Sequence, residues 1–160
     1  MIRAVKTEDA EEIKEIYNYY ILNSIITFEE SPVSTAEMGE RINTIKSVFP
    51  WIVYEKDHQI LGYAYAARWR SRSAYARSVE STVYLKPGTS KKGIGTQLYT
   101  ELIKRLKEMD LHVVIGGISL PNDASVALHE KLGFKKVAHF KEVGFKFNNW
   151  IDVGYWELLI

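Results

Sequence analysis

The sequence predicts a single domain of the α/β (or α+β) class, in which helices flank one mixed sheet. A chain of 160 residues has the length of one domain, so we take 1–160 as one unit. Strand-like and helix-like stretches alternate along it, with no internal repeat or low-complexity segment. Within 78–109 a strand, a glycine-containing turn and a helix follow one another, and the rest of the chain is organised around this unit.

Composition narrows the functional classes. The net charge of +1 gives no argument for a nucleic-acid partner. The absence of cysteine excludes disulfides, thiol catalysis and cysteine metal sites, and we expect no metal. The chain has no signal peptide and no apolar run of about 18 residues, so we expect a cytoplasmic protein without a membrane partner.

The N-terminal part is predicted to form two helices and three strands. Acidic residues follow Thr7, which can cap the first helix, and apolar residues mark its buried face as far as Ile21. Ser34-x-x-Glu37 is a capping box that opens the second helix. The expected elements are a strand at Ile2–Val5, the two helices with a loop over 23–32 between them, the second helix running towards Val48, and a hairpin of Trp51–Glu55 and Ile60–Trp69.

The central unit begins with a β-branched and aromatic stretch that ends at Leu85. Pro87 and Gly88 then interrupt the strand. Beyond Gly93, apolar residues recur at helical spacing and predict a helix with one buried face: Ile94, Leu98, Leu102, Leu106 and Met109.

The C-terminal part is predicted to add a buried strand, a short helix and a final pair of strands. Asn122 or Asp123 can cap the short helix, which we expect to end at a left-handed Gly133. The expected bounds are Val113–Ile118 for the strand, and Phe134–Phe147 and Trp150–Leu159 for the pair, with Asn148-Asn149 as their turn.

The glycine turn before the central helix is a candidate anion site. A helix N-terminus has free backbone N–H groups and partial positive charge, and glycines allow close approach, so we expect a phosphate-bearing ligand at Lys91–Thr96. Ile94-Gly95 stands where a Walker A loop has Lys-Ser/Thr. Leu98 replaces the third glycine of the dinucleotide fingerprint. Taken alone, a tight strand–helix connection explains the glycines equally well.

Several motifs together resemble the GNAT superfamily of acyltransferases. They are Val83-Tyr84-Leu85-x-Pro87 with Lys91-Lys92-Gly93-Ile94-Gly95, Asn122-Asp123-Ala124-Ser125, and Leu128-His129-Glu130-Lys131-Leu132-Gly133-Phe134. Three further segments resemble the phosphinothricin and methionine sulfoximine acetyltransferase branch of this superfamily. They are Val79-Glu80-Ser81-Thr82-Val83-Tyr84, Leu120-Pro121-Asn122-Asp123 and Asn149-Trp150-Ile151-Asp152-Val153-Gly154-Tyr155-Trp156. The resemblance covers nearly the whole chain. It implies a mostly antiparallel sheet whose parallel pair separates at the cofactor site, acetyl-CoA as co-substrate, and a homodimer.

For acetyl-CoA, the resemblance implies contacts from the end of the central strand, the glycine turn and one asparagine. These residues are Val83, Tyr84, Leu85, Lys91, Lys92, Gly93, Ile94, Gly95, Thr96 and Asn122. A backbone N–H near Leu85 would polarise the thioester carbonyl. The superfamily usually has Arg or Gln three residues before the first glycine, where this chain has Ser90. One side-chain contact to the pyrophosphate is therefore expected to be missing, although the two lysines can supply charge.

Acetyl transfer to an amine requires a group that takes a proton from the ammonium and a proton for the departing thiolate. Val79 and Val83 flank Glu80 in the central strand, and partial desolvation there raises a carboxyl pKa and suits a base. An ion-paired glutamate on the sheet is the alternative. The resemblance assigns the base to Glu80 and proton transfer to His129, which is otherwise a histidine packed on a helix.

For the substrate, the resemblance implies contacts from two loops, at Phe28, Glu30, Arg72, Ser73, Ala74 and Tyr75. The planar guanidinium of Arg72 can hold a carboxylate or phosphinate through two hydrogen bonds. A solvated loop is the alternative for the basic segment 68–77. Lys146 and Trp150 are weaker candidates at the rim of the site.

The sequence therefore predicts an acetyl-CoA-dependent N-acetyltransferase. It acts by direct attack of a free amine on the thioester, and its small-molecule substrate resembles an amino acid of the phosphinothricin or methionine sulfoximine type. One rival hypothesis is an acetyltransferase for protein N-termini or lysines, which needs an open peptide groove. Another is a non-catalytic acyl-CoA-binding sensor domain, for which Ser90 leaves room.

Overall fold

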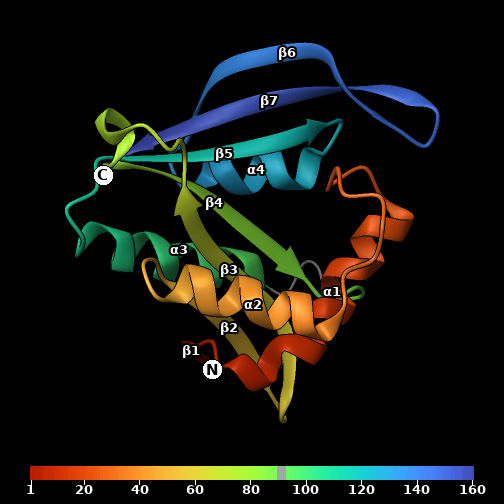
Figure 1. The fold of residues 1–160 in the computed structure, drawn as a ribbon. Coiled ribbons are helices and arrows are strands. Elements are labelled where there is room, and N and C mark those ends of the chain that lie inside the picture. Colours follow the sequence, from red (N-terminus) through yellow and green to blue (C-terminus); the bar gives the residue numbers. More distant parts are fainter. Residues whose placement is uncertain (90–92) are drawn as a thin grey trace.

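A computed structural model describes residues 1–89 and 93–160 and shows one seven-stranded sheet between two layers of helices (Figure 1). The strands are β1 (Ile2–Ala4), β2 (Trp51–Lys56), β3 (Gln59–Arg68), β4 (Ser78–Leu85), β5 (Val113–Leu120), β6 (Lys135–Lys146) and β7 (Asn149–Leu159). The helices are α1 (Ala10–Asn23), α2 (Thr35–Lys46), α3 (Ile94–Lys107) and α4 (Asp123–Lys131). The mixed sheet flanked by helices confirms the predicted fold class.

The order of strands across the sheet is β1-β2-β3-β4-β5-β7-β6. Every neighbouring pair is antiparallel except β4 and β5, which run parallel. That parallel pairing begins at Ser78↔Val113 and ends at Glu80↔Ile115. Beyond it, β4 stays with β3 while β5 stays with β7, so the sheet opens between its two central strands. Figure 1 shows the two strands diverging. This is the separation that the resemblance implied.

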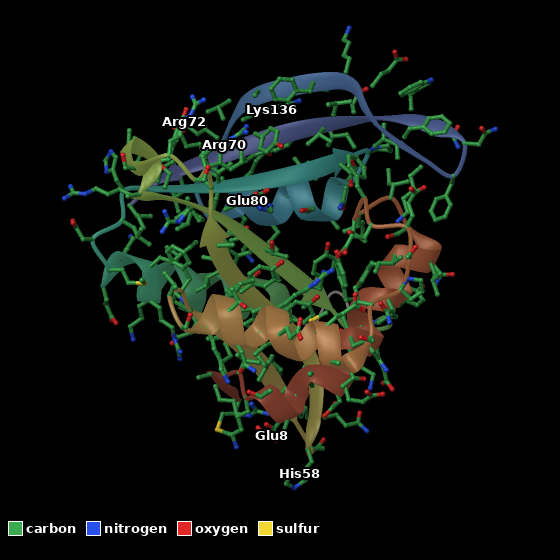
Figure 2. The ribbon with its side chains drawn as sticks, viewed as in Figure 1. Glu8, His58, Arg70, Arg72, Glu80 and Lys136 are labelled. Carbon is green, nitrogen blue, oxygen red and sulfur yellow. The ribbon has the colours of Figure 1, made fainter. Side chains whose placement is uncertain are left out.

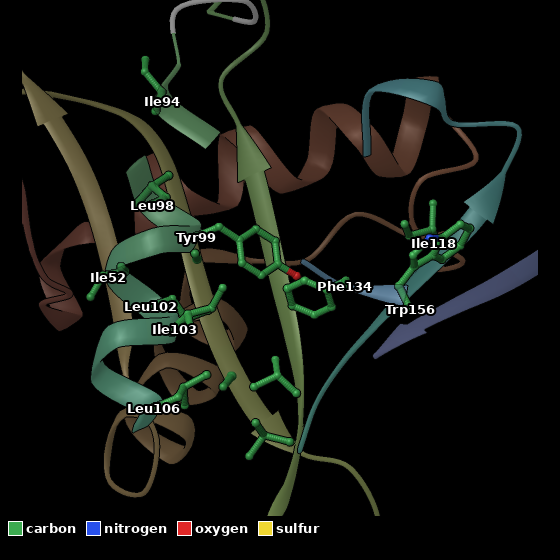
Figure 3. Close-up of a cluster of buried hydrophobic side chains, with 14 residues drawn as sticks. Ile52, Ile94, Leu98, Tyr99, Leu102, Ile103, Leu106, Ile118, Phe134 and Trp156 are labelled. Atoms are coloured by element: carbon green, nitrogen blue, oxygen red, sulfur yellow. The ribbon is translucent and has the colours of Figure 1, made fainter. Parts of the chain in front are cut away.

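Two apolar cores hold the layers to the sheet. One lies between the sheet and α3, and Figure 3 shows its large side chains gathered around Leu98, Leu102 and Leu106. The other lies between the first half of the sheet and the helices α1 and α2, with Ile13 and Ile42 fully buried. Burial of apolar area at about 25 cal/mol per Å² makes these cores the main stabilising term. They also fix β4 from both sides, which is the strand that carries Glu80.

The local signals at helix ends had mixed outcomes. The capping box is present, because Ser34 accepts from the Glu37 N–H and the Glu37 carboxylate accepts from the Ser34 N–H. Asn122, rather than Asp123, caps α4 through a hydrogen bond from Ser125 N. The prediction that Thr7 caps the first helix is wrong: its hydroxyl donates to Asn43 on α2, and α1 begins after a short 3₁₀ turn.

Candidate functional site

A cavity of about 300 Å³ occupies the opening between β4 and β5. Side chains and backbone of both strands line it, and the loop before α2 and the helix α4 close its ends. Its lining includes Phe28, Glu80, Ser81, Tyr99, Gly117, Ser119, His129 and Tyr155. This volume is at the lower end of the range for small-molecule sites.

Glu80 lies on the wall of this cavity, at the last parallel pair before the strands separate. Its side chain is partly buried, and no hydrogen bond or ion pair joins its carboxylate to another residue within 1–89 and 93–160. Burial raises the pKa of Glu80, and the positive charge of Arg70 opposes that rise. Figure 2 places Arg70, Arg72 and Glu80 at the same end of the sheet. A carboxylate with a raised pKa and a free lone pair can accept a proton from a bound ammonium.

On the opposite side of β4, a hydrogen-bonded chain of buried side chains runs towards α4. The Ser81 hydroxyl is 2.6 Å from the Tyr99 hydroxyl, which is 2.8 Å from Nε2 of His129. Nδ1 of His129 is 2.7 Å from the carbonyl oxygen of Ser125. These contacts join β4, α3 and α4 along one wall of the cavity.

The directions of these hydrogen bonds follow from the chemistry of the groups. A carbonyl oxygen can only accept, so Nδ1 of His129 carries the hydrogen. Burial lowers the pKa of His129, which keeps the ring neutral, so Nε2 accepts from the hydroxyl of Tyr99. Tyr99 then accepts from the hydroxyl of Ser81. Both ring nitrogens of His129 are therefore occupied.

The position of the His129 ring depends on a glycine in β5. A Cβ added to Gly116 would overlap the imidazole, so only glycine leaves room for the ring against the strand. His129 is 3% exposed although it lines the cavity. The catalytic role of His129 stays a prediction, and its Nε2 atom is already occupied by the hydroxyl of Tyr99.

A second cavity, of about 230 Å³, lies beside the first at the N-terminus of α3. Its lining includes Val83, Tyr84, Leu85, Gly95 and Asn122. Of these, Val83, Tyr84 and Asn122 also line the first cavity. The two cavities are thus adjacent: the first lies at the opening between β4 and β5, and the second lies at the N-terminus of α3. This juxtaposition brings the expected acetyl-CoA contacts next to Glu80.

Of the two glycines of the turn, Gly93 is required by the local backbone and Gly95 leaves space beside α4. Gly93 precedes α3 with φ of 73°, a left-handed conformation that favours glycine. A Cβ at Gly95 would lie 3.4 Å from Leu128, so a larger side chain there would fill the cavity. Ile94 points into the core and Thr96 is partly buried. Ser90, Lys91 and Lys92 lie outside the described residues.

The edge of β4 that faces the opening offers free backbone groups. Lys86 N donates to Leu61 O on β3, so by alternation Val83 and Leu85 direct their N–H and C=O groups towards the other edge. There β5 has already moved away. The carbonyl of Leu85 accepts from the hydroxyl of Tyr20 at 2.6 Å. The N–H groups of this edge can bind a carbonyl oxygen placed in the opening.

The loop before α2 forms one wall of the cavity. The ring of Phe28 packs directly over Gly144 of β6, where a Cβ would overlap it. Lys146 of β6 is 2% exposed, and its Nζ donates to Thr27 O at 2.8 Å. Lys146 thus fastens the loop from within and lines neither cavity, and its role at the rim of the site stays a prediction. Trp150, by contrast, is 65% exposed.

The second substrate loop is more open. Arg72, Ser73, Ala74 and Tyr75 are all exposed and do not line either cavity, and the same holds for Glu30 in the first loop. Their substrate contacts stay predictions.

Sequence reasoning did not single out Tyr99 or Arg70. Tyr99 lies one residue from Leu98 within the buried face of α3, where an aromatic residue ordinarily indicates core packing. Its polar tip was the only signal, since a buried tyrosine hydroxyl usually has a partner. Arg70 is one of several cations in the basic segment, and its closeness to Glu80 arises from the pairing of distant strands.

Comparisons with known proteins agree with this site. The family model for the acetyltransferase (GNAT) domain matches residues 2–154. The chain is 36% identical to a phosphinothricin N-acetyltransferase from Streptomyces viridochromogenes, over 98% of this chain and 85% of that protein. It is 32% identical to an L-methionine sulfoximine/L-methionine sulfone acetyltransferase from Salmonella typhimurium, over 98% of this chain and 92% of that protein.

The fold matches a solved structure of the same kind. A GNAT superfamily phosphinothricin acetyltransferase from Sinorhizobium meliloti, in complex with AcCoA, superimposes with a TM-score of 0.96 at 36% identity. The match covers 100% of this chain and 88% of that one. Within residues 1–89 and 93–160, no group of side chains suited to a metal ion is found, and no helix is long and apolar enough to cross a membrane.

Proposed function

Because this chain belongs to the GNAT family of acetyltransferases, we propose that it transfers the acetyl group of acetyl-CoA to the free amine of a small amino acid of the phosphinothricin or methionine sulfoximine type. The observation that carries this proposal is the Glu80 carboxylate, which faces the opening between β4 and β5 without a partner among residues 1–89 and 93–160. A group that is neither paired nor fully solvated there is suited to a charged ligand.

The residues at the opening fit acetyl-CoA. The left-handed Gly93, the close approach allowed by Gly95 and the free N–H groups at the start of α3 suit the phosphates. The extended pantetheine arm can pair with the free edge of β4 in the way that an additional strand would. When bound, acetyl-CoA supplies an activated thioester.

The chain contributes the proton transfers and the positioning. Glu80 accepts a proton from the substrate ammonium, and its raised pKa brings it closer to the pKa of the amine. Backbone N–H groups of Val83 and Leu85 hold the carbonyl oxygen of the acyl group. Tyr99 lines the cavity between Ser81 and His129, and its hydroxyl can turn from His129 to donate its own proton to the departing thiolate.

The substrate contacts are part of the same proposal. Phe28 supplies an apolar wall, and Arg72 and Tyr75 lie on the loop that follows β3, near the Arg70 charge. A guanidinium can hold phosphinyl or sulfonyl oxygens of the substrate side chain. The homodimer and the cytoplasmic location are also proposals. Exposed apolar side chains on β6 and β7, such as Phe140, Val143 and Trp150, support an interface between two copies, which light scattering would test.

A screen of acceptor amines tests the proposal. Thiol release from acetyl-CoA is measured with phosphinothricin, methionine sulfoximine and methionine sulfone, beside ordinary amino acids, polyamines, aminoglycosides and peptides with free N-termini. We expect the first three to give the highest kcat/KM. Turnover only with peptides would favour the protein acetyltransferase, and acetyl-CoA binding without turnover of any amine would favour the sensor domain.

A further inference from the structure

Ser119 of β5 carries a buried hydroxyl that has no partner among the described residues. Its side chain is 7% exposed, and its Oγ makes no hydrogen bond to any residue within 1–89 and 93–160. Buried hydroxyls are ordinarily paired, because an unpaired one loses its hydrogen bonds to water without compensation. Trp51 Nε1 is the other such atom in that part of the chain, but Trp51 lies outside the cavity at the opening.

The neighbouring strand supplies a direct comparison. Ser81 of β4 is 6% exposed and lines the same cavity as Ser119. Its hydroxyl, however, is paired with Tyr99 at 2.6 Å. Two serines of equal burial on the walls of one cavity thus differ only in whether the protein satisfies them. The unsatisfied one is available to a ligand.

Ser119 is on the same face of the sheet as Glu80. Side chains alternate along β5, so Gly117 and Ser119 share a face. That face is the one next to the base, because a Cβ at Gly117 would lie 3.2 Å from Oε1 of Glu80. Two residues of strand span about 6.6 Å, so the hydroxyl of Ser119 is roughly that far along the cavity from Glu80.

This spacing selects a part of the substrate. In an α-amino acid the nitrogen and a carboxylate oxygen are about 3 Å apart, from the standard bond lengths. An ammonium hydrogen-bonded to Glu80 therefore brings its α-carboxylate within reach of Ser119, whereas a side-chain terminus extends several bonds further. Arg70, whose charge acts on Glu80, lies in the segment between β3 and η2 (Ser73–Tyr75), where its guanidinium stacks on Trp69 and can face that terminus.

We propose that Ser119 is a further substrate-binding residue, whose hydroxyl donates a hydrogen bond to the α-carboxylate of the amino acid held at Glu80. The inference rests on the proposed function, and it adds that β5 binds the α-carboxylate end of the substrate. Removing Ser119 Oγ relieves the free protein of one unpaired buried group, yet it takes from the complex a charge-assisted hydrogen bond.

The test compares Ser119→Ala and wild type with two substrates, L-methionine sulfone and its decarboxylated analogue 3-(methylsulfonyl)propylamine. We expect Ser119→Ala to raise KM for the amino acid roughly ten-fold, as loss of a hydrogen bond to a charged group does. KM for the decarboxylated amine and for acetyl-CoA should stay the same. Equal effects on both amines, or no effect on either, would overturn the assignment.

Thermal unfolding of the ligand-free protein gives a second readout that does not depend on turnover. Ser119→Ala should leave Tm unchanged or raise it, while the matched variant Ser81→Ala should lower Tm because the Tyr99 hydroxyl loses its hydrogen-bond donor. A lower Tm for Ser119→Ala would show that the protein itself uses this hydroxyl, and would overturn the inference. If the wild type acetylates no amino acid while Ser119→Ala unfolds as expected, the proposed function fails and the α-carboxylate assignment fails with it.

Discussion

The two sides of the opening between β4 and β5 differ in how their polar groups are satisfied. On the side of α3 and α4, Ser81, Tyr99 and His129 form a closed chain that ends on a backbone carbonyl. On the other side, Glu80 and Ser119 face the cavity without a partner in the part of the chain that the structure describes. The closed side has the features of a support that holds its residues in place. The open side has the features of a surface that a ligand completes.

Glu80→Gln should have the largest effect, because it removes the base from the open side. We expect kcat/KM to fall by roughly 10²–10⁴. The wild-type enzyme works with Glu80 ionised, so activity should rise as pH passes the raised pKa of this group, and that acidic limb should vanish in the variant. A pH series of kcat/KM measures both.

The matched control is Glu40→Gln, since Glu40 is exposed on α2 and lines neither cavity at the opening. It should keep the wild-type rate and pH profile. An active Glu80→Gln with an unchanged acidic limb would mean that the open side does not supply the base.

Tyr99→Phe breaks the closed side and should mainly affect stability. It leaves His129 Nε2 and the Ser81 hydroxyl without their shared partner, at a cost of about 1–3 kcal/mol in the free energy of unfolding. For a chain of this size that corresponds to a fall in Tm of roughly 2–4 °C per kcal/mol. Calorimetry measures it, with Tyr19→Phe at an exposed tyrosine as control.

The kinetics of Tyr99→Phe sharpen the same comparison. If the closed side only positions groups, kcat should fall less than in Glu80→Gln. A loss of kcat as large as that of Glu80→Gln, with Tm unchanged, would instead make Tyr99 a primary acid and contradict the contrast between the two sides.

Arg70→Gln should move the acidic limb without removing the base. The positive charge of Arg70 lowers the pKa of Glu80, so its loss raises that pKa and shifts the limb to higher pH. Because Arg70 is exposed, added salt should shrink the difference between variant and wild type. Arg68→Gln is the control, since Arg68 is exposed and its charge is not among those that shift Glu80. A limb that moves to lower pH in Arg70→Gln would refute this coupling.

Lys146→Met should have the smallest effect. It removes the hydrogen bond from β6 to Thr27 O that fastens the loop carrying Phe28. One hydrogen bond contributes about 0.5–1.5 kcal/mol, so KM for the amine should rise a few-fold with kcat nearly unchanged. Steady-state kinetics measure this beside Lys141→Met, an exposed lysine of the same strand. Equal KM values in the two variants would show that the loop needs no such fastening.

Much of the fold followed from local sequence patterns. The apolar stripe of α3, the capping box of α2 and the left-handed Gly133 each depend on neighbours within a few residues, and the structure confirms them. The stripe ends inside α3, which stops at Lys107, so Met109 packs on the core from beyond the helix. Thr7 was misassigned because its partner, Asn43, comes from a distant helix.

The candidate site was only partly predictable. Glu80 and His129 were identified through motifs, whereas the roles of Tyr99, Ser119 and Lys146 depend on which distant groups meet their polar atoms. A tyrosine in an apolar stripe, a serine in a strand and a lysine near a turn look ordinary in sequence. Only the packing of strands and helices shows that one is bonded twice, one is unpaired and one is buried.

A structure of the ternary complex with methionine sulfone and a non-transferring thioether analogue of acetyl-CoA tests the central claim most directly. The account predicts the substrate amine within hydrogen-bonding distance of Glu80, its α-carboxylate at the hydroxyl of Ser119, and an unchanged chain from Ser81 to His129. A substrate bound instead against His129, with the Ser81–Tyr99 contact broken and Glu80 facing solvent, would contradict it.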